Sequence, residues 1–318
     1  MDYRNDYKKI IKARENIRDF IYETPLIRLN HISELLNTSV YAKLENMQKT
    51  NSFKIRGALN KIRSLDEESL KKGVVTASSG NHGKAIATCA KMLGIPATIV
   101  LPDTSTETKR QMIRDLGAEI VISTVEERFK TAKEIEEKEG KTFIHPFDDI
   151  EVSRGQGTIA VEILNKMDHQ KIIVPVGGGG LISGIATYVK GVTRWTEVIG
   201  VEPENVARYS KSIEAGEISD VIRGDTLADG LLSVRPGEIV YPIVRDLVDE
   251  IVTSNDKSIK KALNLLYNRE KLIVEPSSAI GLAAILEGKI DYNERDKLVL
   301  IITGGNVSTA AIEDIINP

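Results

Sequence analysis

The stretch GVVTASSGNHGKAIATCAKMLGIPATIVLP, residues 73–102, predicts a strand, a helix and a second strand in succession. Its two ends, residues 73–78 and 96–102, are apolar and rich in valine, threonine and isoleucine, as expected of buried strands. The apolar residues between them recur at helical spacing: Ile86, Cys89, Ala90 and Leu93. Gly94 then stands where a helix would end. Strand, helix and strand in this order are typical of a parallel sheet covered by helices.

The same alternation continues along the chain. Four more apolar runs predict strands: residues 119–124, 171–176, 197–203 and 297–303. A helical pattern, KRQMIRDLG at 109–117, precedes the first of them. We therefore expect an α/β fold with mainly parallel twisted sheets and helices on both faces. The only cysteine, Cys89, lies on the apolar side of its predicted helix, which favours core packing over a nucleophilic role.

Composition narrows the classes of function. The chain has 318 residues, with 43 Lys and Arg against 46 Asp and Glu, so no global charge would attract nucleic acid or anionic lipid. No apolar run approaches the roughly 20 residues that span a bilayer, so we expect no membrane role. The first ten residues, MDYRNDYKKI, lack the apolar core of a signal peptide, and a single cysteine excludes an intrachain disulfide. A cytoplasmic location is the resulting expectation.

The segment KTNSFKIRGALNK, residues 49–61, places a charge among apolar neighbours. Lys54 lies between Phe53 and Ile55 at the start of a predicted helix, and Ser52 is expected to be the N-cap of that helix. A partly desolvated lysine has a lowered pKa and can act as an amine nucleophile or base. A solvated surface lysine is the alternative.

Two further segments follow predicted strands and have the composition of anion sites. TASSGNHGKAIA, residues 76–87, leads into a helix whose free N–H groups suit a carboxylate, although a simple capped turn has the same composition. VPVGGGGLISGIA, residues 174–186, has four successive glycines, where a plain turn needs one or two. Something must therefore approach this backbone closely, and a single phosphate fits better than a dinucleotide or nucleoside triphosphate because neither nucleotide-binding fingerprint is present.

The last segment is LIITGGNVS, residues 300–308, where a predicted strand ends on Thr303. Its hydroxyl could meet the edge of a heteroaromatic ring, or merely cap the strand end. The four histidines show no paired ligand spacing, which argues against a histidine-based metal site: His31, His82, His145 and His169. A lysine amine, a carboxylate turn, a phosphate loop and this hydroxyl are the parts that hold pyridoxal phosphate and an amino acid.

These motifs, in this order, resemble the threonine dehydratase and serine racemase family of fold-type II pyridoxal-phosphate enzymes, whose two-domain fold is similar to that of tryptophan synthase β. The resemblance runs from about Thr24 to Val307 and rests on the following segments: SFKIRGA, SSGNHG, HPFDD, GQGT, the tetraglycine loop, TLADGLLSVRPGE and TGGN. It implies a large cofactor-binding domain, residues 1–45 and 148–318, and a small mobile domain, residues 46–147, that carries the substrate-carboxylate loop. A homodimer is also expected.

The resemblance also implies roles for single residues. Lys54 would be the Schiff-base lysine, with Phe53 packed beside the cofactor and Glu275 near it. Asn81 would bond the ring hydroxyl, and Thr303 would face the pyridine nitrogen, where the family usually has serine. The phosphate would be held by Gly177, Gly178, Gly179 and Gly180. The substrate carboxylate would be bound by Ser78, Ser79, Asn81 and His82.

The implied activity is β-elimination of L-threonine or L-serine, which gives a 2-oxo acid and ammonia. Lys54 would remove the α-proton, and Ser79 could return a proton on the opposite face, which would add serine racemase activity. The alternatives are a protein that is mainly a serine racemase or a 3-hydroxyaspartate dehydratase, and a non-catalytic protein that binds pyridoxal phosphate and amino acids. A cysteine synthase would have aspartate where this chain has Ile55, and a nicotinamide-dependent dehydrogenase would need the missing fingerprint.

Besides Thr303, three features depart from the family pattern. Asn51 occupies a position where the family has glycine. Glu202 matches one ligand of a racemase-like divalent-metal site, but Arg208 stands where a second carboxylate is expected and would repel a cation. We also expect no regulatory domain of the kind that follows the catalytic part of biosynthetic threonine dehydratases, because the chain stops at Pro318.

Overall fold

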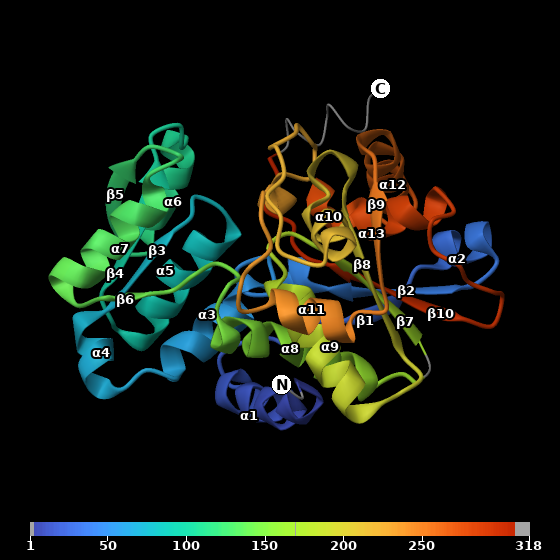
Figure 1. Ribbon diagram of the computed structural model, residues 1–318, viewed down its shortest axis with the longest axis horizontal. Coiled ribbons are helices and arrows are strands. Elements are labelled where there is room, and N and C mark those ends of the chain that lie inside the picture. The colour runs from blue at the N-terminus through green and yellow to red at the C-terminus, as the bar shows by residue number, and fades with distance from the viewer. Residues whose placement is uncertain (1–2, 169, 309–318) are drawn as a thin grey trace.

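The computed structural model describes residues 3–168 and 170–308, so His169 lies outside the described residues. The described residues form two separate sheets, one of four strands and one of six. Figure 1 shows the four-stranded sheet with its helices on the left, the six-stranded sheet on the right, and α3 (Lys54–Arg63) between them.

The four-stranded sheet is parallel throughout and has the order β5-β4-β3-β6. Its strands and helices are β3 (Val74–Ala77), β4 (Ala97–Pro102), β5 (Glu119–Ser123), β6 (Thr142–Phe143), α4 (Glu67–Lys72), α5 (Asn81–Leu93), α6 (Glu107–Asp115) and α7 (Arg128–Glu139). Val74 packs in one core with Ile86 of α5, and Val75 packs in another with Ala132 of α7. Successive residues of a strand face opposite sides, so this sheet has a helix layer on each face.

The six-stranded sheet has the order β1-β2-β10-β7-β8-β9, and only its β1–β2 pair is antiparallel. Its strands are β1 (Leu26–Arg28), β2 (Ser39–Leu44), β7 (Gln170–Pro175), β8 (Glu197–Pro203), β9 (Glu250–Ser254) and β10 (Lys297–Ile302). The helices around it are α1 (Tyr7–Ile17), α2 (Asn30–Leu36), α8 (Ile150–Leu164), α9 (Gly180–Val192), α10 (Arg208–Ala215), α11 (Tyr241–Leu247), α12 (Asp256–Asn268) and α13 (Pro276–Leu286). Four short 3₁₀ turns complete the described elements: η1 (Tyr3–Asp6), η2 (Glu45–Met47), η3 (Glu204–Val206) and η4 (Asp229–Leu231).

Strand β10 shows how this sheet is buried on both faces. Leu298 and Leu300 belong to the core that includes Ile280 of α13, whereas Val299 belongs to the core that includes Ile185 of α9. A strand without a polar face is typical of a parallel sheet between two helix layers. The predicted α/β fold is therefore confirmed.

All six predicted strands are present, and α5 ends at Gly94 in the left-handed conformation (φ 67°), as expected. Cys89 is fully buried, in agreement with its predicted packing role. The sequence did not predict four strands: β1, β2, β6 and β9. The smaller sheet lies entirely within the proposed insertion at residues 46–147, but the domain limits themselves stay a prediction.

The fold brings the carboxyl ends of several parallel strands to one edge, where ligands bind in open α/β sheets. Ser52, just before α3, pairs with Gly304, just after β10, in an isolated antiparallel bridge. The Phe53 N–H donates to the carbonyl oxygen of Thr303 over 3.1 Å. Backbone contacts thus hold together the two segments that carry the predicted lysine and the predicted strand-end hydroxyl.

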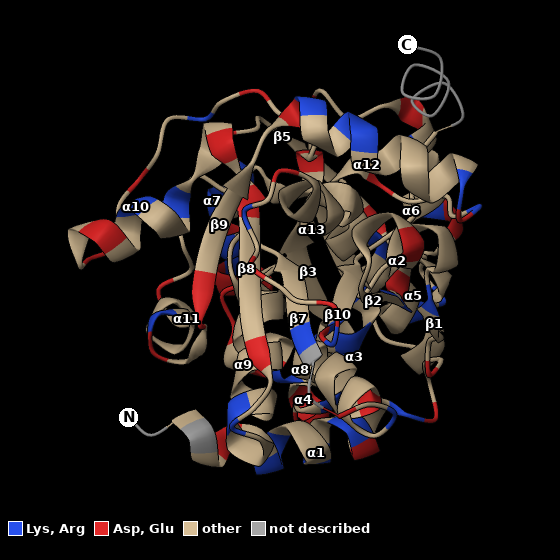
Figure 2. Ribbon diagram, turned by 90° about the vertical axis from the view of Figure 1, so that its right-hand side faces the viewer, with Lys and Arg blue, Asp and Glu red and all other residues tan. Residues whose placement is uncertain are grey.

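Charges of both signs are interspersed over the helices and loops of the face seen in Figure 2. Within the described part of the chain, no helix combines the length and apolar character needed to cross a bilayer.

Candidate active site

Lys54 is the first residue of α3, and its half-buried side chain extends toward the segment that follows β6. The Nζ atom donates a hydrogen bond of 2.8 Å to the carbonyl oxygen of Pro146 and lies 5.0 Å from the centre of the Phe53 ring. Desolvation lowers the pKa of Lys54 from 10.5 to about 8, against an opposing effect of the Glu275 charge. A lysine with this pKa keeps a larger uncharged fraction near neutral pH than a solvated lysine does, as an amine nucleophile or base requires.

The prediction that Ser52 is the N-cap of this helix was wrong. Phe53 occupies the N-cap position without a side-chain hydrogen bond, and the buried Ser52 hydroxyl has no partner among the described residues. The reason is the bridge between Ser52 and Gly304, which fixes the backbone before the helix in a different way.

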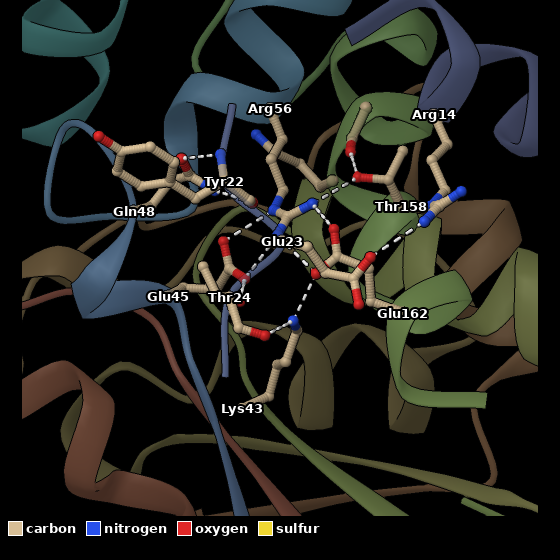
Figure 3. A network of polar contacts seen from close by, with 12 residues as sticks. Arg14, Tyr22, Glu23, Thr24, Lys43, Glu45, Gln48, Arg56, Thr158 and Glu162 are labelled. Carbon is tan, nitrogen blue, oxygen red and sulfur yellow. Dashed lines mark hydrogen bonds and ion pairs between the residues drawn. The ribbon is translucent and has the colours of Figure 1, made fainter. Parts of the chain in front are cut away.

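Helix α3 is anchored by a buried ion network around Arg56, drawn in Figure 3. The Arg56 guanidinium donates to both oxygens of Glu45, over 2.8 and 2.9 Å, and to both oxygens of Glu162, over 2.6 and 3.0 Å. Lys43 donates to Glu162 and to the Thr24 carbonyl oxygen. Two cations and two carboxylates balance in charge here, and bidentate geometry holds α3 in one orientation. Lys54, two residues before Arg56, inherits that orientation.

The tetraglycine loop joins β7 to α9, as predicted. The N–H groups of Gly177, Gly178 and Gly179 make no hydrogen bond within residues 3–168 and 170–308, and those of the first turn of α9 are free by helix geometry. The carbonyl oxygens of the loop all accept hydrogen bonds: from Arg208, from Tyr209 together with the Gly237 N–H, and from Ser183 in α9. A row of unpaired N–H groups at a helix start is an anion site.

The close approach expected at these glycines comes in part from the protein itself. A Cβ at Gly178 would lie 2.2 Å from the Phe147 ring, and one at Gly179 would lie 1.9 Å from the Tyr209 hydroxyl. At Gly180 the nearest atom is the Phe147 carbonyl oxygen, 2.7 Å away. Only Gly177, whose nearest neighbour is at 3.4 Å, would accept a methyl group without a protein clash. The interpretation that a ligand alone requires the glycines is therefore corrected.

Asn81, Glu275 and Asn306 form a polar junction between the two sheets. The Asn81 amide nitrogen donates to both oxygens of Glu275 over 3.0 Å, and its amide oxygen accepts from the Asn306 side chain over 2.7 Å. The Asn306 backbone N–H also donates to Glu275, over 3.0 Å. Burial raises the pKa of Glu275, although the hydrogen bond from Asn81 opposes this effect. The junction fixes the side chain predicted to meet the ring hydroxyl.

The turn from β3 into α5 contains the other predicted carboxylate-binding residues. Ser78 accepts from the Gly80 N–H over 3.3 Å, whereas the half-buried Ser79 hydroxyl makes no hydrogen bond within the described residues. Gly80 is the N-cap of α5, and no side chain caps that helix. Ser79 is therefore not a helix cap. His82 is buried, its Nε2 contacts the Ile144 carbonyl oxygen at 3.2 Å, and its Nδ1 has no partner among the described residues.

Burial, reinforced by the Lys54 charge, lowers the pKa of His82 to about 3, so this imidazole is neutral at physiological pH. His82 therefore offers an uncharged polar group close to Lys54. Thr303, directly after β10, is buried, and its hydroxyl pairs with that of Ser278 over 2.9 Å. No carboxylate is paired with Thr303 among the described residues.

Glu202, the weak metal-ligand candidate, and Arg208 are both engaged by backbone groups of the protein. Both oxygens of Glu202 accept backbone N–H groups at the start of α10, those of Tyr209 and Ser210, over 3.0 and 2.8 Å. The Arg208 guanidinium points to backbone carbonyl groups of the glycine loop. Within residues 3–168 and 170–308, no cluster of three or more His, Cys, Asp or Glu side chains could hold a metal ion.

The residues present fit pyridoxal phosphate. The unpaired N–H groups of the glycine loop suit its phosphate, and the Lys54 amine suits its aldehyde. The orphaned Ser52 hydroxyl lies two residues from that amine, as expected where a polar ligand completes the hydrogen bonding.

Sequence reasoning missed four residues of this site. HPFDD and TGGN were recognised as motifs, but no role was assigned to Pro146, Phe147 or Asn306. The first acts through its backbone and the second through its ring, which a motif does not reveal. Arg208 was considered only as a charge that would repel a cation.

Comparisons with known proteins agree with this geometry. The family model described as pyridoxal-phosphate dependent enzyme matches residues 17–304. The L-threonine dehydratase catabolic TdcB of Escherichia coli (strain K12) is 41% identical over 310 residues, which are 96% of this chain and 94% of that protein. The L-threonine ammonia-lyase of Thermotoga maritima is 40% identical over 311 residues, 97% of this chain and 77% of that protein. The structure of maize serine racemase matches with a TM-score of 0.92 at 37% identity, covering 97% of this chain and 96% of that one. The chain belongs to the pyridoxal-phosphate dependent enzymes.

Proposed function

We propose that this protein is a dehydratase that converts L-threonine or L-serine into a 2-oxo acid and ammonia. The observation that carries the proposal is the Lys54 amine, whose pKa is lowered to about 8, next to a neutral His82 and an anion-binding loop. The similarity to two threonine dehydratases over nearly the whole chain supports the same reaction.

Each part of the cofactor has a candidate partner. Gly177, Gly178, Gly179 and Gly180 would bind the phosphate, and Lys54 would bind the aldehyde carbon. Asn81 would meet the ring hydroxyl, with Phe53 and Glu275 nearby, and Thr303 would meet the ring nitrogen. When bound, pyridoxal phosphate withdraws electrons from the α-carbon of an amino acid, which makes the α-proton easier to remove.

Lys54 is the base that would take the α-proton. As a free amine the Nζ atom would accept that proton, and its lowered pKa would keep part of it uncharged. The turn formed by Ser78, Ser79 and Asn81 would hold the substrate carboxylate at the start of α5, where N–H groups are unpaired by helix geometry. The β-hydroxyl would gain a proton and leave as water, and the enamine product would be hydrolysed to the oxo acid and ammonia.

Thr303 favours elimination over transamination. A hydroxyl cannot hold a proton on a ring nitrogen by charge pairing, as an aspartate would. A cofactor ring facing Thr303 would therefore withdraw electrons less strongly, which would favour prompt departure of the β-hydroxyl.

A slower serine racemase activity is the second candidate function. It is supported by the half-buried Ser79 hydroxyl, which no described residue engages, and by the likeness to maize serine racemase. Inversion needs a proton donor on the face opposite Lys54, and Ser79 is the candidate.

We further propose that residues 46–147 move as a small domain against residues 1–45 and 148–318, and that the enzyme is a cytoplasmic homodimer. The separate four-stranded sheet supports the domain proposal.

The test is an assay of oxo-acid and ammonia release from L-threonine, L-serine, D-serine and both 3-hydroxyaspartates. We expect L-threonine and L-serine to give the two products in equal amounts. A clear preference for a 3-hydroxyaspartate would replace the proposed substrate. Release of ammonia from none of the five would leave a non-catalytic binding protein.

A further inference from the structure

The carbonyl groups of the tetraglycine loop are held from one side by two successive residues of α10. The fully buried Arg208 guanidinium donates to the carbonyl oxygens of Val176, over 2.9 Å, and Gly177, over 2.8 Å. The Tyr209 hydroxyl donates to that of Gly178 over 3.0 Å. Three consecutive peptide groups thus contact one helix start, and the Gly237 N–H is a second donor, over 3.1 Å, to the Gly178 carbonyl oxygen.

This arrangement determines where the loop N–H groups point. The carbonyl of one residue and the N–H of the next belong to one trans peptide plane and point in opposite directions. Holding the Val176 and Gly177 oxygens against Arg208 therefore turns the Gly177 and Gly178 N–H groups away from it. These are the N–H groups that no described residue accepts.

The surroundings of Arg208 are those of a bound cation. Besides Val176 and Gly177, the guanidinium donates to the Leu231 carbonyl oxygen over 2.8 Å. A Glu202 oxygen lies 3.9 Å from Nε, which itself has no hydrogen-bond partner among the described residues. Carbonyl and carboxylate oxygens around a buried positive charge form the ligand set that hard metal ions prefer.

We propose that Arg208 is a built-in cation that holds the glycine loop in its anion-binding orientation, so that the protein retains the cofactor phosphate without an exchangeable metal ion. Arg208 is a positioning residue, because it acts on the phosphate through the peptide groups of the loop. The inference rests on the proposed binding of phosphate by Gly177–Gly180.

The first test compares pyridoxal phosphate with pyridoxal, which lacks the phosphate, as ligands of the apoprotein. Arg208→Met removes the donors but keeps a side chain of similar length. We expect its Kd for pyridoxal phosphate to rise about ten- to hundredfold, as for other residues that orient direct ligands, while its Kd for pyridoxal stays near the wild-type value. Arg245→Met is the matched control, since Arg245 pairs with Asp246 at the surface.

The outcomes separate this inference from the proposal on which it rests. If wild type bound both ligands equally well, the phosphate role of the loop would be wrong. If wild type preferred pyridoxal phosphate and Arg208→Met kept that preference, the role of Arg208 alone would be wrong. Equal weakening toward both ligands would reduce Arg208 to general structural support.

The second test replaces the built-in charge by an exchangeable one. Arg208→Asp leaves the carbonyl oxygens of Val176, Gly177 and Leu231 beside two carboxylates, a set suited to Ca²⁺. In EDTA this variant should bind pyridoxal phosphate weakly. Added Ca²⁺ should lower its Kd for pyridoxal phosphate by about tenfold or more. The Kd of the wild type for pyridoxal phosphate should change with neither EDTA nor Ca²⁺.

The proposal that Arg208 is a built-in cation would be wrong if wild type lost the cofactor in EDTA. It would also be wrong if Ca²⁺ did not change the affinity of Arg208→Asp for pyridoxal phosphate. If Arg208→Met does not fold, Arg208→Lys takes its place, because an ammonium keeps the charge but lacks the planar fork of donors. Its preference for pyridoxal phosphate over pyridoxal should then lie between that of wild type and that of Arg208→Asp in EDTA. A preference equal to that of wild type would again count against the proposal.

Discussion

The side-chain amine of Lys54 donates a hydrogen bond of 2.8 Å to the carbonyl oxygen of Pro146. Pro146 follows the last strand of the smaller sheet, whereas Lys54 begins the helix between the two sheets. The amine therefore occupies a defined position before it meets any ligand. Its proposed role depends on being uncharged in that position.

The purified protein should be yellow, and Lys54→Ala should be colourless and inactive, because a methyl group can neither bind the cofactor aldehyde nor take a proton. Visible absorbance and oxo-acid release measure the two effects. Lys61→Ala, on the same helix, is the control because Lys61 pairs with Asp149 instead. Undiminished turnover in Lys54→Ala would end the assignment.

Cofactor capture by the apoprotein should depend on pH through Lys54. Its pKa is lowered from 10.5 to about 8, so the uncharged amine dominates above pH 8 and falls about tenfold for each pH unit below it. The rate of yellow-colour formation after mixing with pyridoxal phosphate should rise with pH and level off near 8. A rise that continues toward pH 10.5 would indicate a solvated lysine.

Ser79→Ala should lose racemisation, by about a hundredfold or more, and keep elimination of L-serine, because only inversion needs a proton donor opposite Lys54. Chiral chromatography of L-serine reactions gives the D-serine yield, and ammonia release gives elimination. A wild type that forms no D-serine, or a variant that forms as much, would remove Ser79 from the mechanism. Loss of both activities together would indicate carboxylate binding instead.

Gly178→Ala should lower the stability of the folded protein as well as its retention of the cofactor, because the added Cβ would lie 2.2 Å from the Phe147 ring. The sequence alone predicts a much larger effect on the cofactor for Gly178→Val. The thermal midpoint of the apoprotein should fall for Gly178→Ala and recover in part when Phe147→Ala is added. Gly177→Ala is the matched control for folding, since its Cβ would make only ordinary contacts.

Arg56→Met should lower the free energy of unfolding by about 3–5 kcal/mol, because Glu45 and Glu162 would remain buried without their shared cation. Urea unfolding of the apoprotein at neutral pH measures this cost. Arg235→Met, which removes an exposed ion pair with Asp220, should change stability by less than about 1 kcal/mol. An equal effect of both substitutions would deny the network its anchoring role.

The same network makes the folding stability of the wild type fall at acidic pH. Burial acts to raise the pKa of Glu45, but the Arg56 charge and hydrogen bonds outweigh it, so that the pKa of Glu45 falls below 4.5. A carboxylate with a depressed pKa stabilises the fold above its unfolded pKa, and this contribution disappears as pH falls through the folded value. Stability should therefore decline below about pH 4.5 in wild type.

The fold was largely predictable because its strands are long apolar runs. Strand β2 was missed since Lys43 interrupts its apolar pattern, and the sequence alone does not reveal that Glu162 will neutralise this charge. Strand β6 has only two residues, too few for a periodic signal. Local patterns thus identify strands that are stable by burial alone and miss those that depend on distant partners.

The candidate site was predictable where the backbone or a motif defines it, as at the glycine loop and at Lys54. Contacts made by backbone atoms of distant segments were not, and the Pro146 carbonyl oxygen is the clearest case. Ser52 was assigned to a helix cap because its neighbours favour one. Its actual backbone partner, Gly304, comes 252 residues later in the sequence (304 minus 52), so local patterns could not reveal it. The roles of individual site residues stay predictions until the variants above are measured.

The position of β10 has a consequence for biosynthesis. This strand lies between β2 and β7 in the six-stranded sheet, although it comes later in the sequence than every other described strand. While the ribosome is still making the chain, β2 therefore has no partner strand on that side. Its backbone groups there stay unpaired until β10 has been made. Pairings of such long sequence separation form slowly and leave strand edges open to aggregation. The middle of the six-stranded sheet is accordingly expected to pair last, after every other described strand has been made.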